Sequence, residues 1–318
     1  MNILLTGGAG FIGANLAEAL LNDERVSQLR IFDNLSTGHR YNIKGLLDHP
    51  RCSFVEGDIR DIEACRAACQ GMDRISHQAA LGSVPRSIRD PLTTHAVNCT
   101  GTLNIFQAAV EKGVPRIVFA ASSSTYGDHK ALPKVEDTIG KPLSPYAVTK
   151  YVNELYADVF AKAYAINYIG LRYFNVFGPK QDPNGAYAAV IPLFFKAALH
   201  NEAPTIHGDG SFSRDFTYID NVVQANLRAL FTKEQAALNE IYNVACGDRT
   251  DLNTLWGHIR RITGSRVDAQ YGPQREGDIP HSLASIKKAK QLLGYQPSHT
   301  VDEGLEEAYA FYKQLFAR

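Results

Sequence analysis

Short runs of apolar residues alternate with longer amphipathic stretches through the first half of the chain. The runs have the length of strands, and the stretches between them carry apolar residues at helical spacing. The sequence predicts strands at Asn2–Thr6, Leu29–Asp33, Ser53–Glu56, Arg74–His77, Arg116–Ala121 and Asn167–Leu171. It predicts helices at Phe11–Leu21, Asp61–Cys69, Pro91–Lys112 and Pro145–Tyr164. This alternation predicts an α/β fold with a parallel, doubly wound sheet and right-handed crossovers.

The alternation ends near Arg172, where Gly- and Pro-containing turn signals begin. A predicted helix at Asp220–Phe231 and a predicted strand at Glu240–Ala245 are expected to return to the sheet. The tail is expected to hold two or three helices broken by Gly and Pro. We predict one domain built around the sheet and a smaller α+β lobe that binds the substrate. The first is expected to comprise residues 1–172 and 213–246, and the second residues 173–212 and 247–318.

Composition narrows the class of protein. Lys and Arg number 33, as do Asp and Glu, so the formal net charge is zero. This balance argues against a nucleic-acid or membrane-surface protein, and no apolar run approaches the length of a membrane span. The five cysteines lack zinc-site spacing and are expected to be free thiols in a reducing compartment. With no signal-peptide pattern before the first strand, we expect a cytoplasmic protein without metal, nucleic-acid or membrane partners.

A glycine-rich run, TGGAGFIG at residues 6–13, follows the first predicted strand, and three of its glycines are expected to have separate roles. Gly7 is expected to permit a tight turn, Gly10 a close approach to a pyrophosphate, and Gly13 close packing of the helix on the strand. Asp33 ends the second strand, twenty residues after Gly13. Its carboxylate can accept hydrogen bonds from ribose hydroxyls and repels a 2′-phosphate, so the pattern predicts NAD over NADP. Phe11 and Ile12, within the same run, are expected to line this site.

Further cofactor contacts are expected where the third and fourth strands end. Asp58 and Ile59 would flank the adenine, with a helix N-cap as the alternative role for Asp58. The residues after the fourth strand offer backbone contact with the cofactor; these are Gln78, Ala79 and Ala80. His77 is expected to be a packed strand residue.

Candidate catalytic side chains lie on a helix and at a strand end. Tyr146 and Lys150 are four residues apart and share a helix face, although an ordinary amphipathic helix would also allow this spacing. Ser122 and Ser124 follow the fifth strand, at the sheet edge where ligands bind, and are expected to share a strand face. Bringing a tyrosine from pKa ~10 to neutrality takes roughly 4 kcal/mol. A positive charge about 5 Å away supplies roughly 3 kcal/mol, so Lys150 and a nicotinamide ring together are expected to activate Tyr146.

With these motifs in place, the whole chain resembles the extended short-chain dehydrogenase/reductases, and within them the nucleotide-sugar 4-epimerases. The stretches that carry the resemblance are TGGAGFIG at 6–13, DNLSTG at 33–38, SPYAVTK at 144–150, LRYFNVFGP at 171–179, RDFTYIDN at 214–221, YNVA at 242–245 and REGD at 275–278. The resemblance implies a Rossmann domain that holds NAD. It also implies cofactor contacts from Asn34, Ser36, Thr37, Gly38 and Phe174.

The resemblance further implies a UDP-sugar substrate. Asn175 would contact the diphosphate or the sugar, and Ala189 and Val190 would lie against the uracil. Arg214 and Arg275 would bind the diphosphate, since a guanidinium can make two hydrogen bonds to one phosphate, although each alone could be a solvated surface charge. Other implied substrate contacts are Ser83, Arg86, Ser122, Ser123, Tyr146, Thr205, His207 and, on the uridine ribose, Asp278.

One departure bears on the reaction. Sugar 4,6-dehydratases and UDP-glucuronate decarboxylases usually carry an acidic residue in the fifth-strand motif, whereas this chain has Ser122-Ser123-Ser124-Thr125-Tyr126-Gly127. The absence of a carboxylate favours epimerisation. Residues 80–87 and 186–192 resemble epimerases that prefer N-acetylated sugars, and Ser282 stands where glucose-restricted epimerases carry a tyrosine, although it could have no role in selectivity.

These features lead to one hypothesis and several alternatives. The hypothesis is reversible C4 epimerisation of UDP-N-acetylglucosamine and UDP-N-acetylgalactosamine through a 4-keto intermediate and bound NAD. UDP-glucose and UDP-galactose are further candidate substrates. The alternatives are a UDP-glucose 4-epimerase, a dehydratase, a decarboxylase, a 4-ketoreductase, and a non-catalytic NAD-binding scaffold. Family members commonly form homodimers through helices equivalent to about 91–112 and 145–165, so a homodimer is expected.

Overall fold

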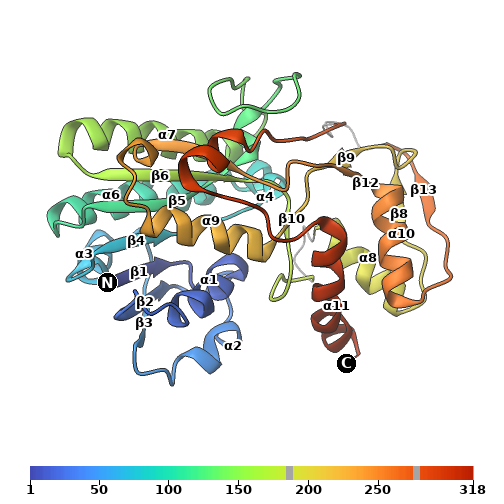
Figure 1. Cartoon of the computed structure of the whole chain (residues 1–318), viewed down its shortest axis with the longest axis horizontal. Coiled ribbons are helices and arrows are strands. Elements are labelled where there is room, and N and C mark those ends of the chain that lie inside the picture. Colours follow the sequence, from blue (N-terminus) through green and yellow to red (C-terminus); the bar gives the residue numbers. More distant parts are fainter. Residues whose placement is uncertain (184–188, 275–279, 318) are drawn as a thin grey trace.

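A seven-stranded parallel sheet forms the centre of the larger part of the molecule (Figure 1). The computed structural model describes residues 1–183, 189–274 and 280–317. The strands lie in the order β3-β2-β1-β4-β5-β6-β11. Successive strands are added on one side of β1 up to β3 and on the other side from β4 onward. The strand order therefore reverses between β1 and β4, which is where open α/β sheets bind their ligands. The strands are β1 (Asn2–Thr6), β2 (Gln28–Asp33), β3 (Cys52–Glu56), β4 (Arg74–His77), β5 (Arg116–Ser122), β6 (Asn167–Tyr173) and β11 (Glu240–Val244).

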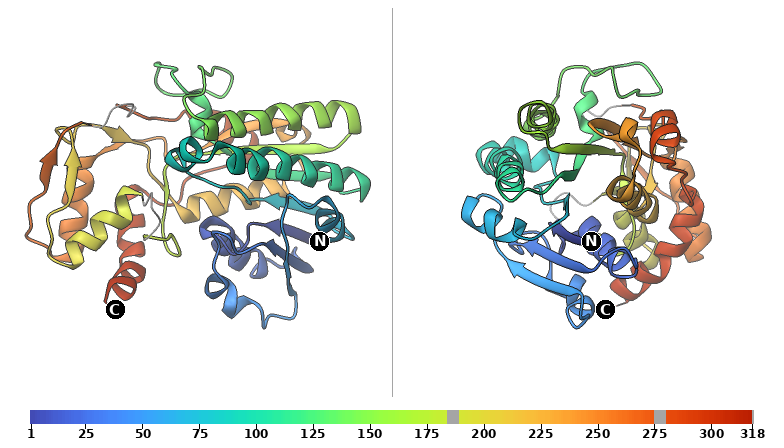
Figure 2. Two further views of the ribbon diagram at one scale, coloured as in Figure 1. Left: turned by 180° about the vertical axis from the view of Figure 1, so that it is seen from behind. Right: turned by 60° about the vertical axis from the view of Figure 1, so that its left-hand side comes forward.

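Helices cover both faces of this sheet (Figure 2). Helices α3 (Ile62–Cys69), α6 (Thr102–Glu111) and α7 (Pro145–Tyr164) lie on one face, and α1 (Phe11–Leu21) and α9 (Ile219–Phe231) lie on the other. In β1, Ile3 and Leu5 join the core on the α1 and α9 side, whereas Leu4 joins the core under α3 and α6. The strands are therefore apolar on both faces, as expected for a buried parallel sheet.

A smaller lobe lies beside the carboxyl ends of the strands, at the right of Figure 1. It contains α8 (Val190–Leu199), α10 (Leu252–Thr263) and α11 (Val301–Phe316). Three two-stranded pairs complete the structure: β7 (Val176–Phe177) with β10 (Thr217–Tyr218), β9 (Ser213–Arg214) with β12 (Thr250–Asp251), and β8 (Thr205–His207) with β13 (Gln270–Gly272). None of the described helices is long and apolar enough to cross a membrane.

The remaining described helices are short. They are α2 (Arg40–Ile43), α4 (Val84–Arg89), α5 (Pro91–His95), the 3₁₀ turns η1 (Lys44–Leu46), η3 (Ser123–Tyr126) and η4 (Gln235–Ala237), and the π-helical turns η2 (Ala96–Gly101) and η5 (Ala289–Leu293).

The α/β class and the parallel sheet are confirmed, and the differences are local. The predicted helix Pro91–Lys112 is interrupted by the π-helical turn η2, and α4 precedes it where no helix was expected. Ser83 explains α4, because its hydroxyl caps the amide of Arg86 and a proline occupies the first turn. Residues 283–285 hydrogen-bond to Lys134 and Asn243. This segment therefore lies beside the large sheet, although the predicted division places it in the smaller lobe.

Candidate active site

The turn after β1 fits only glycine at two of its three expected positions. Gly7 has a φ of +70°, and a Cβ there would stand 2.6 Å from the amide nitrogen of Ala79. A Cβ on Gly13 would stand 2.1 Å from the carbonyl oxygen of Gly7, so α1 packs directly against the end of the strand. Gly10 is the N-cap of α1 and lines the cleft beside it. The arrangement leaves the first amides of α1 facing the cleft, as a pyrophosphate requires.

Asp33 lies at the end of β2, buried and directed at this turn. Its Oδ2 accepts a hydrogen bond from the amide of Ala9 at 2.9 Å, and its Oδ1 accepts one from the amide of Leu35 at 2.8 Å. Each oxygen keeps a lone pair, so both ribose hydroxyls can be bound. The carboxylate is fixed by the backbone before any ligand binds, which supports the predicted choice of NAD.

A cleft of about 640 Å³ extends from this turn across the carboxyl ends of the strands. Most predicted cofactor residues line it: Gly7, Gly10, Phe11, Ile12, Gly13, Asp33, Asn34, Ser36, Thr37, Gly38, Ile59, Gln78, Ala79, Ala80, Tyr146 and Lys150. The predicted substrate contacts Ser83, Arg86, Ser122 and Ser123 also line it, together with Ser124.

Two predicted cofactor residues are not in the wall of this cleft. Asp58 instead pairs with Arg60 at 2.6 Å, which lowers the pKa of Asp58 to about 2, and accepts a hydrogen bond from Asn34. The alternative role for Asp58, a helix N-cap, is wrong, because Asp61 caps α3. Phe174 is fully buried in the core, since it follows Tyr173 at the end of β6 and faces away from the cleft that Tyr173 lines.

The catalytic candidates meet in the middle of the cleft. Ser144 caps α7 by accepting the amide of Ala147 at 3.1 Å, which starts the helix just before Tyr146. Lys150 lies one turn further on and donates from Nζ to the carbonyl oxygen of Ala120 in β5 at 2.8 Å. Tyr146 forms a hydrogen bond with Ser122, the last residue of β5. A tyrosine hydroxyl, a serine hydroxyl and a buried ammonium group thus lie in the wall of one cleft.

The expected position of Ser124 is wrong in detail. Ser122 ends β5, but Ser124 lies in the 3₁₀ turn η3, so the two residues do not share a strand face. The amide of Ser124 donates to Oγ of Ser122 at 3.1 Å. This bond holds the oxygen of Ser122 in place, and both residues line the cleft.

The chain's own groups do not activate the tyrosine by themselves. Burial raises the pKa of Tyr146, and the hydrogen bond from Ser122 opposes this only in part. Burial also lowers the pKa of the Lys150 ammonium to about 8. The predicted activation by Lys150 therefore needs the second positive charge, that of an oxidised nicotinamide ring, close to the tyrosine.

Buried polar side chains hold the catalytic helix in place. The Asn98 amide, in the π-helical turn, donates to the Thr149 hydroxyl at 3.1 Å and exchanges hydrogen bonds with the backbone of Leu81. His77 contacts Thr6 at 2.6 Å and Thr102 at 2.9 Å, and burial lowers its pKa to about 3. His77 thus supports the strand, as predicted. Asn98 was missed, because nothing in its local sequence marks a helix interruption.

A second cavity, of about 540 Å³, opens beside the first. The predicted substrate residues Asn175, Ala189, Val190, Thr205, His207 and Arg214 all line it. Asn175, Val176 and Ala189 line both cavities, so a molecule can extend from one into the other. The structure therefore brings the predicted nucleotide residues together beside the catalytic group.

Three predicted substrate residues are not found among the described residues of these walls. Arg275 and Asp278 lie outside the described residues, as do residues 186–188 of a segment expected to indicate sugar preference. Ser282 hydrogen-bonds through its amide to the carbonyl of Ser213 and is not among the described residues that line either cavity. The expected influence of Ser282 on the choice of sugar stays a prediction.

The cavities also contain residues that the sequence reasoning missed. Tyr173 lines the first cleft, and its hydroxyl donates to Gln78 Oε1 at 3.0 Å and accepts from Asn226 at 2.8 Å. Phe212 and Phe216 line the second cavity. Tyr173 stands in the quoted stretch LRYFN, so strand alternation was the available signal for it.

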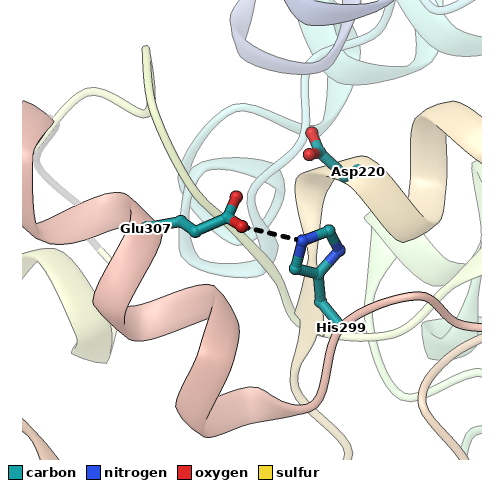
Figure 3. Close-up of side chains that lie close together, drawn as sticks. All are labelled: Asp220, His299 and Glu307. Carbon is teal, nitrogen blue, oxygen red and sulfur yellow. Dashed lines mark hydrogen bonds and ion pairs between the residues drawn. The ribbon is translucent and has the colours of Figure 1, made fainter.

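One cluster of possible metal ligands lies away from these walls: Asp220, His299 and Glu307, whose nearest ligand atoms are within 4.8 Å of one another (Figure 3). Nε2 of His299 is 3.0 Å from Glu307, and its Nδ1 is 2.9 Å from the hydroxyl of Ser298. Both ring nitrogens therefore already have protein partners. Asp220 lies in α9, Glu307 lies in α11 and His299 lies just before α11. The cluster is thus a polar contact between these two helices.

Comparison with known proteins agrees with this geometry. A family model described as the NAD dependent epimerase/dehydratase family matches residues 3–245. The UDP-glucose 4-epimerase of Mycolicibacterium smegmatis is 34% identical over 315 residues, which cover 98% of this chain and 99% of that protein.

Two solved structures extend the comparison to other sugars. The UDP-N-acetylglucosamine 4-epimerase of Methanobrevibacter ruminantium, in complex with UDP-N-acetylmuramic acid, has a TM-score of 0.93 and 36% identity, with 99% of this chain and 98% of that chain covered. The UDP-glucuronic acid 4-epimerase of Bacillus cereus, in complex with UDP-glucuronic acid and NAD, has a TM-score of 0.91 and 31% identity, with 99% and 100% covered.

Proposed function

Because the chain belongs to the NAD-dependent epimerase/dehydratase family, we propose that it inverts C4 of UDP-N-acetylglucosamine and UDP-N-acetylgalactosamine reversibly. UDP-glucose and UDP-galactose are proposed as further substrates. Nucleotide-sugar 4-epimerisation is the activity common to the compared relatives. The observation that carries the proposal is the meeting of Ser122, Tyr146 and Lys150 in a cleft that joins a second, nucleotide-sized cavity.

The glycine turn and Asp33 fit NAD, since the turn leaves no room for a Cβ at Gly7 or Gly13 and the carboxylate keeps two free lone pairs. NAD bound there would supply a reversible acceptor for the C4 hydride. Tyr146 removes the O4 proton, and Ser122 holds O4 by a hydrogen bond. Lys150 keeps positive charge beside the tyrosine. When the hydride returns, Tyr146 gives its proton back to O4.

Inversion requires the 4-keto sugar to present its other face without leaving. We propose that Arg214, with Asn175 and His207, holds the nucleotide in the second cavity while the sugar turns in the first. The NAD site would then belong to residues 1–172 and 213–246, and the nucleotide site to residues 173–212 and 247–318, except that Arg214 of the nucleotide site falls within the first set. Apart from Arg214 and Phe216, the described residues that line the second cavity lie within 173–212 and 247–318, which supports this division.

The rival reaction is loss of water or carbon dioxide from the 4-keto sugar. Dehydration needs an acid or base beside the tyrosine, and the fifth-strand run offers only hydroxyls. Among the described residues, Asp33 and Asp182 are the carboxylates that line the cleft. Asp33 binds backbone amides, and Asp182 lies 3.8 Å from His39. These contacts favour epimerisation.

The relatives differ in their sugars, so substrate identity is settled by assay. Purified protein is incubated with each of four sugars: UDP-N-acetylglucosamine, UDP-N-acetylgalactosamine, UDP-glucose and UDP-galactose. The proposal predicts C4 epimers without added NADH, with the N-acetylated pair turned over fastest, and no product with Tyr146→Phe. Turnover of the plain sugars alone would identify a UDP-glucose 4-epimerase. Loss of water would identify a dehydratase.

We also propose that the protein is a homodimer paired through α5 and α7. Val148, Leu155 and Val159 share one face of α7 and are exposed, and Leu92 on the adjacent α5 is 82% exposed. A second copy would cover this apolar face by two-fold pairing of α7. Light scattering after gel filtration should give twice the chain mass, and Val159→Glu should give a monomer. Tyr41→Glu, an exposed site on α2, is the control and should remain dimeric; a monomeric wild-type protein would reject the proposal.

A further inference from the structure

A carboxylate with no solvent access lies behind the wall of the second cavity. Asp215 stands between Arg214 and Phe216, both of which line that cavity, and its side chain is fully buried. Removing a charged group from water is costly unless hydrogen bonds replace the lost hydration. The contacts of this carboxylate therefore call for an explanation.

Three backbone amides from two other segments bind the Asp215 carboxylate. Oδ1 accepts from Cys246 at 2.9 Å, and Oδ2 accepts from Gly247 at 3.1 Å and from Ala284 at 3.2 Å. Cys246 and Gly247 lie just beyond the end of β11, at the edge of the large sheet. Ala284 belongs to the segment that runs beside Lys134. One side chain thus joins the link between β9 and β10 to the framework that carries the catalytic helix.

The backbone of the same residue reaches the cavity wall from the other side. The carbonyl oxygen of Asp215 accepts a hydrogen bond from Asn175 Nδ2 at 3.1 Å. Asn175 has a φ of +37° and lines both cavities. Arg214, the preceding residue, pairs with Thr250 in β12. A shift at Asp215 would therefore move Arg214 and Asn175 together.

We propose that Asp215 is a positioning residue for the nucleotide: its carboxylate fixes the wall formed by Arg214, Phe216 and Asn175 at a set distance from Tyr146. This rests on the proposed function only in taking a nucleoside diphosphate as the ligand of the second cavity. A fixed nucleotide matters here because the sugar must turn while its other end stays in place. Asp215 itself is not among the described residues that line either cavity.

A carboxylate suits this position better than an amide. Asparagine has one acceptor atom in place of two, and its NH₂ group would face an N–H donor. Asp215→Asn should therefore release at least one of the three amides and loosen the wall. A misplacement of about 1 Å at a binding site can cost roughly 100-fold in rate or affinity, so weakening of 10- to 100-fold is expected. Burial raises the pKa of Asp215 to about 7, so the comparison is made at pH 8, where the group is ionised.

The test uses the NAD-loaded protein and UDP as the probe in titration calorimetry. Asp215→Asn is expected to bind UDP at least tenfold more weakly than wild type and to keep its bound NAD. Amide exchange at Cys246, Gly247 and Ala284 should become faster. Asp248→Asn, an exposed carboxylate near the same turn, is the matched control and should bind UDP like wild type. In turnover, KM for the UDP-sugar should rise more than kcat falls.

Wild-type affinity for UDP in Asp215→Asn, with only a lower melting temperature, would show a merely structural residue and overturn the proposal. If Asp215→Asn does not fold, Asp215→Glu decides, because it keeps the charge but lengthens the arm by one methylene. It is expected to weaken UDP binding as well, and wild-type affinity would refute positioning. A wild-type protein that binds UDP but turns over no UDP-sugar would refute the proposed function alone. A wild-type protein that does not bind UDP would refute both.

Discussion

Arg172 and Glu154 form an ion pair inside the protein, with side chains 4% and 6% exposed. The guanidinium makes two hydrogen bonds to the carboxylate, at 2.9 and 2.7 Å, and fastens α7 to β6. Replacing Glu154 by Gln removes one charge and leaves the other buried, which costs about 3–5 kcal/mol. An unfolding entropy of about 2.1 cal/mol/K per residue gives roughly 0.7 kcal/mol/K for 318 residues. Glu154→Gln should therefore lower the melting temperature by about 4–7 °C.

The measurement is thermal and denaturant unfolding of the NAD-saturated protein, since bound ligand adds to apparent stability. The same helix provides the control. Lys162 and Asp158 form an exposed pair at 2.6 Å, and such pairs contribute about 0–1 kcal/mol. Asp158→Asn should change stability by less than about 1 kcal/mol. If Glu154→Gln were no more destabilising than Asp158→Asn, the reasoning from burial would be refuted.

Three further predictions concern the site. Tyr146→Phe should lower turnover at least about 100-fold while the protein retains NAD. A near-normal rate of the variant in a coupled epimerase assay would show that Tyr146 is not the base. Gly13→Ala puts a Cβ 2.1 Å from the Gly7 carbonyl oxygen and should abolish NAD retention, measured by absorbance. Gly45→Ala is the control, because a Cβ at that position has no atom within 4 Å, and this variant should retain NAD. The pKa of His77 in the folded protein is lowered to about 3, so below pH ~6.5 the unfolded chain binds a proton that the folded protein does not. The free energy of unfolding should therefore fall by up to about 1.4 kcal/mol per pH unit below that pH. If His77→Gln showed the same dependence of the free energy of unfolding on pH as wild type, this prediction would be contradicted.

Strand alternation and the glycine spacing were enough to predict the sheet and the cofactor turn. They are local patterns, and the parallel sheet satisfies them with shifts of one or two residues at the strand ends. Asp33 and Ser122 meet at the same edge because they end parallel strands, and Tyr146 lies near the start of the helix α7 beside that edge. This is why Asp33, Ser122 and Tyr146 could be placed together without a structure.

Other features depend on long-range contacts that no local pattern encodes. The π-helical turn forms where Asn98 binds the backbone of Leu81 and the hydroxyl of Thr149. The pairing of Asp58 with Arg60 was not predicted, because an arginine two residues away could not be distinguished from a solvated surface charge. Asp215 drew no attention, since its three amide partners are 31, 32 and 69 residues away.

The central claim is that oxidation and reduction at C4 cancel within each turnover. The direct measurement uses UDP-N-acetylglucosamine carrying deuterium at C4, with the holoenzyme in ordinary water and no added NADH. The predicted result is UDP-N-acetylgalactosamine that retains the deuterium at C4, observed by NMR and mass spectrometry, with the bound nicotinamide oxidised at the end. A C4 epimer that has exchanged its deuterium for hydrogen, or a requirement for external NADH, would contradict the account.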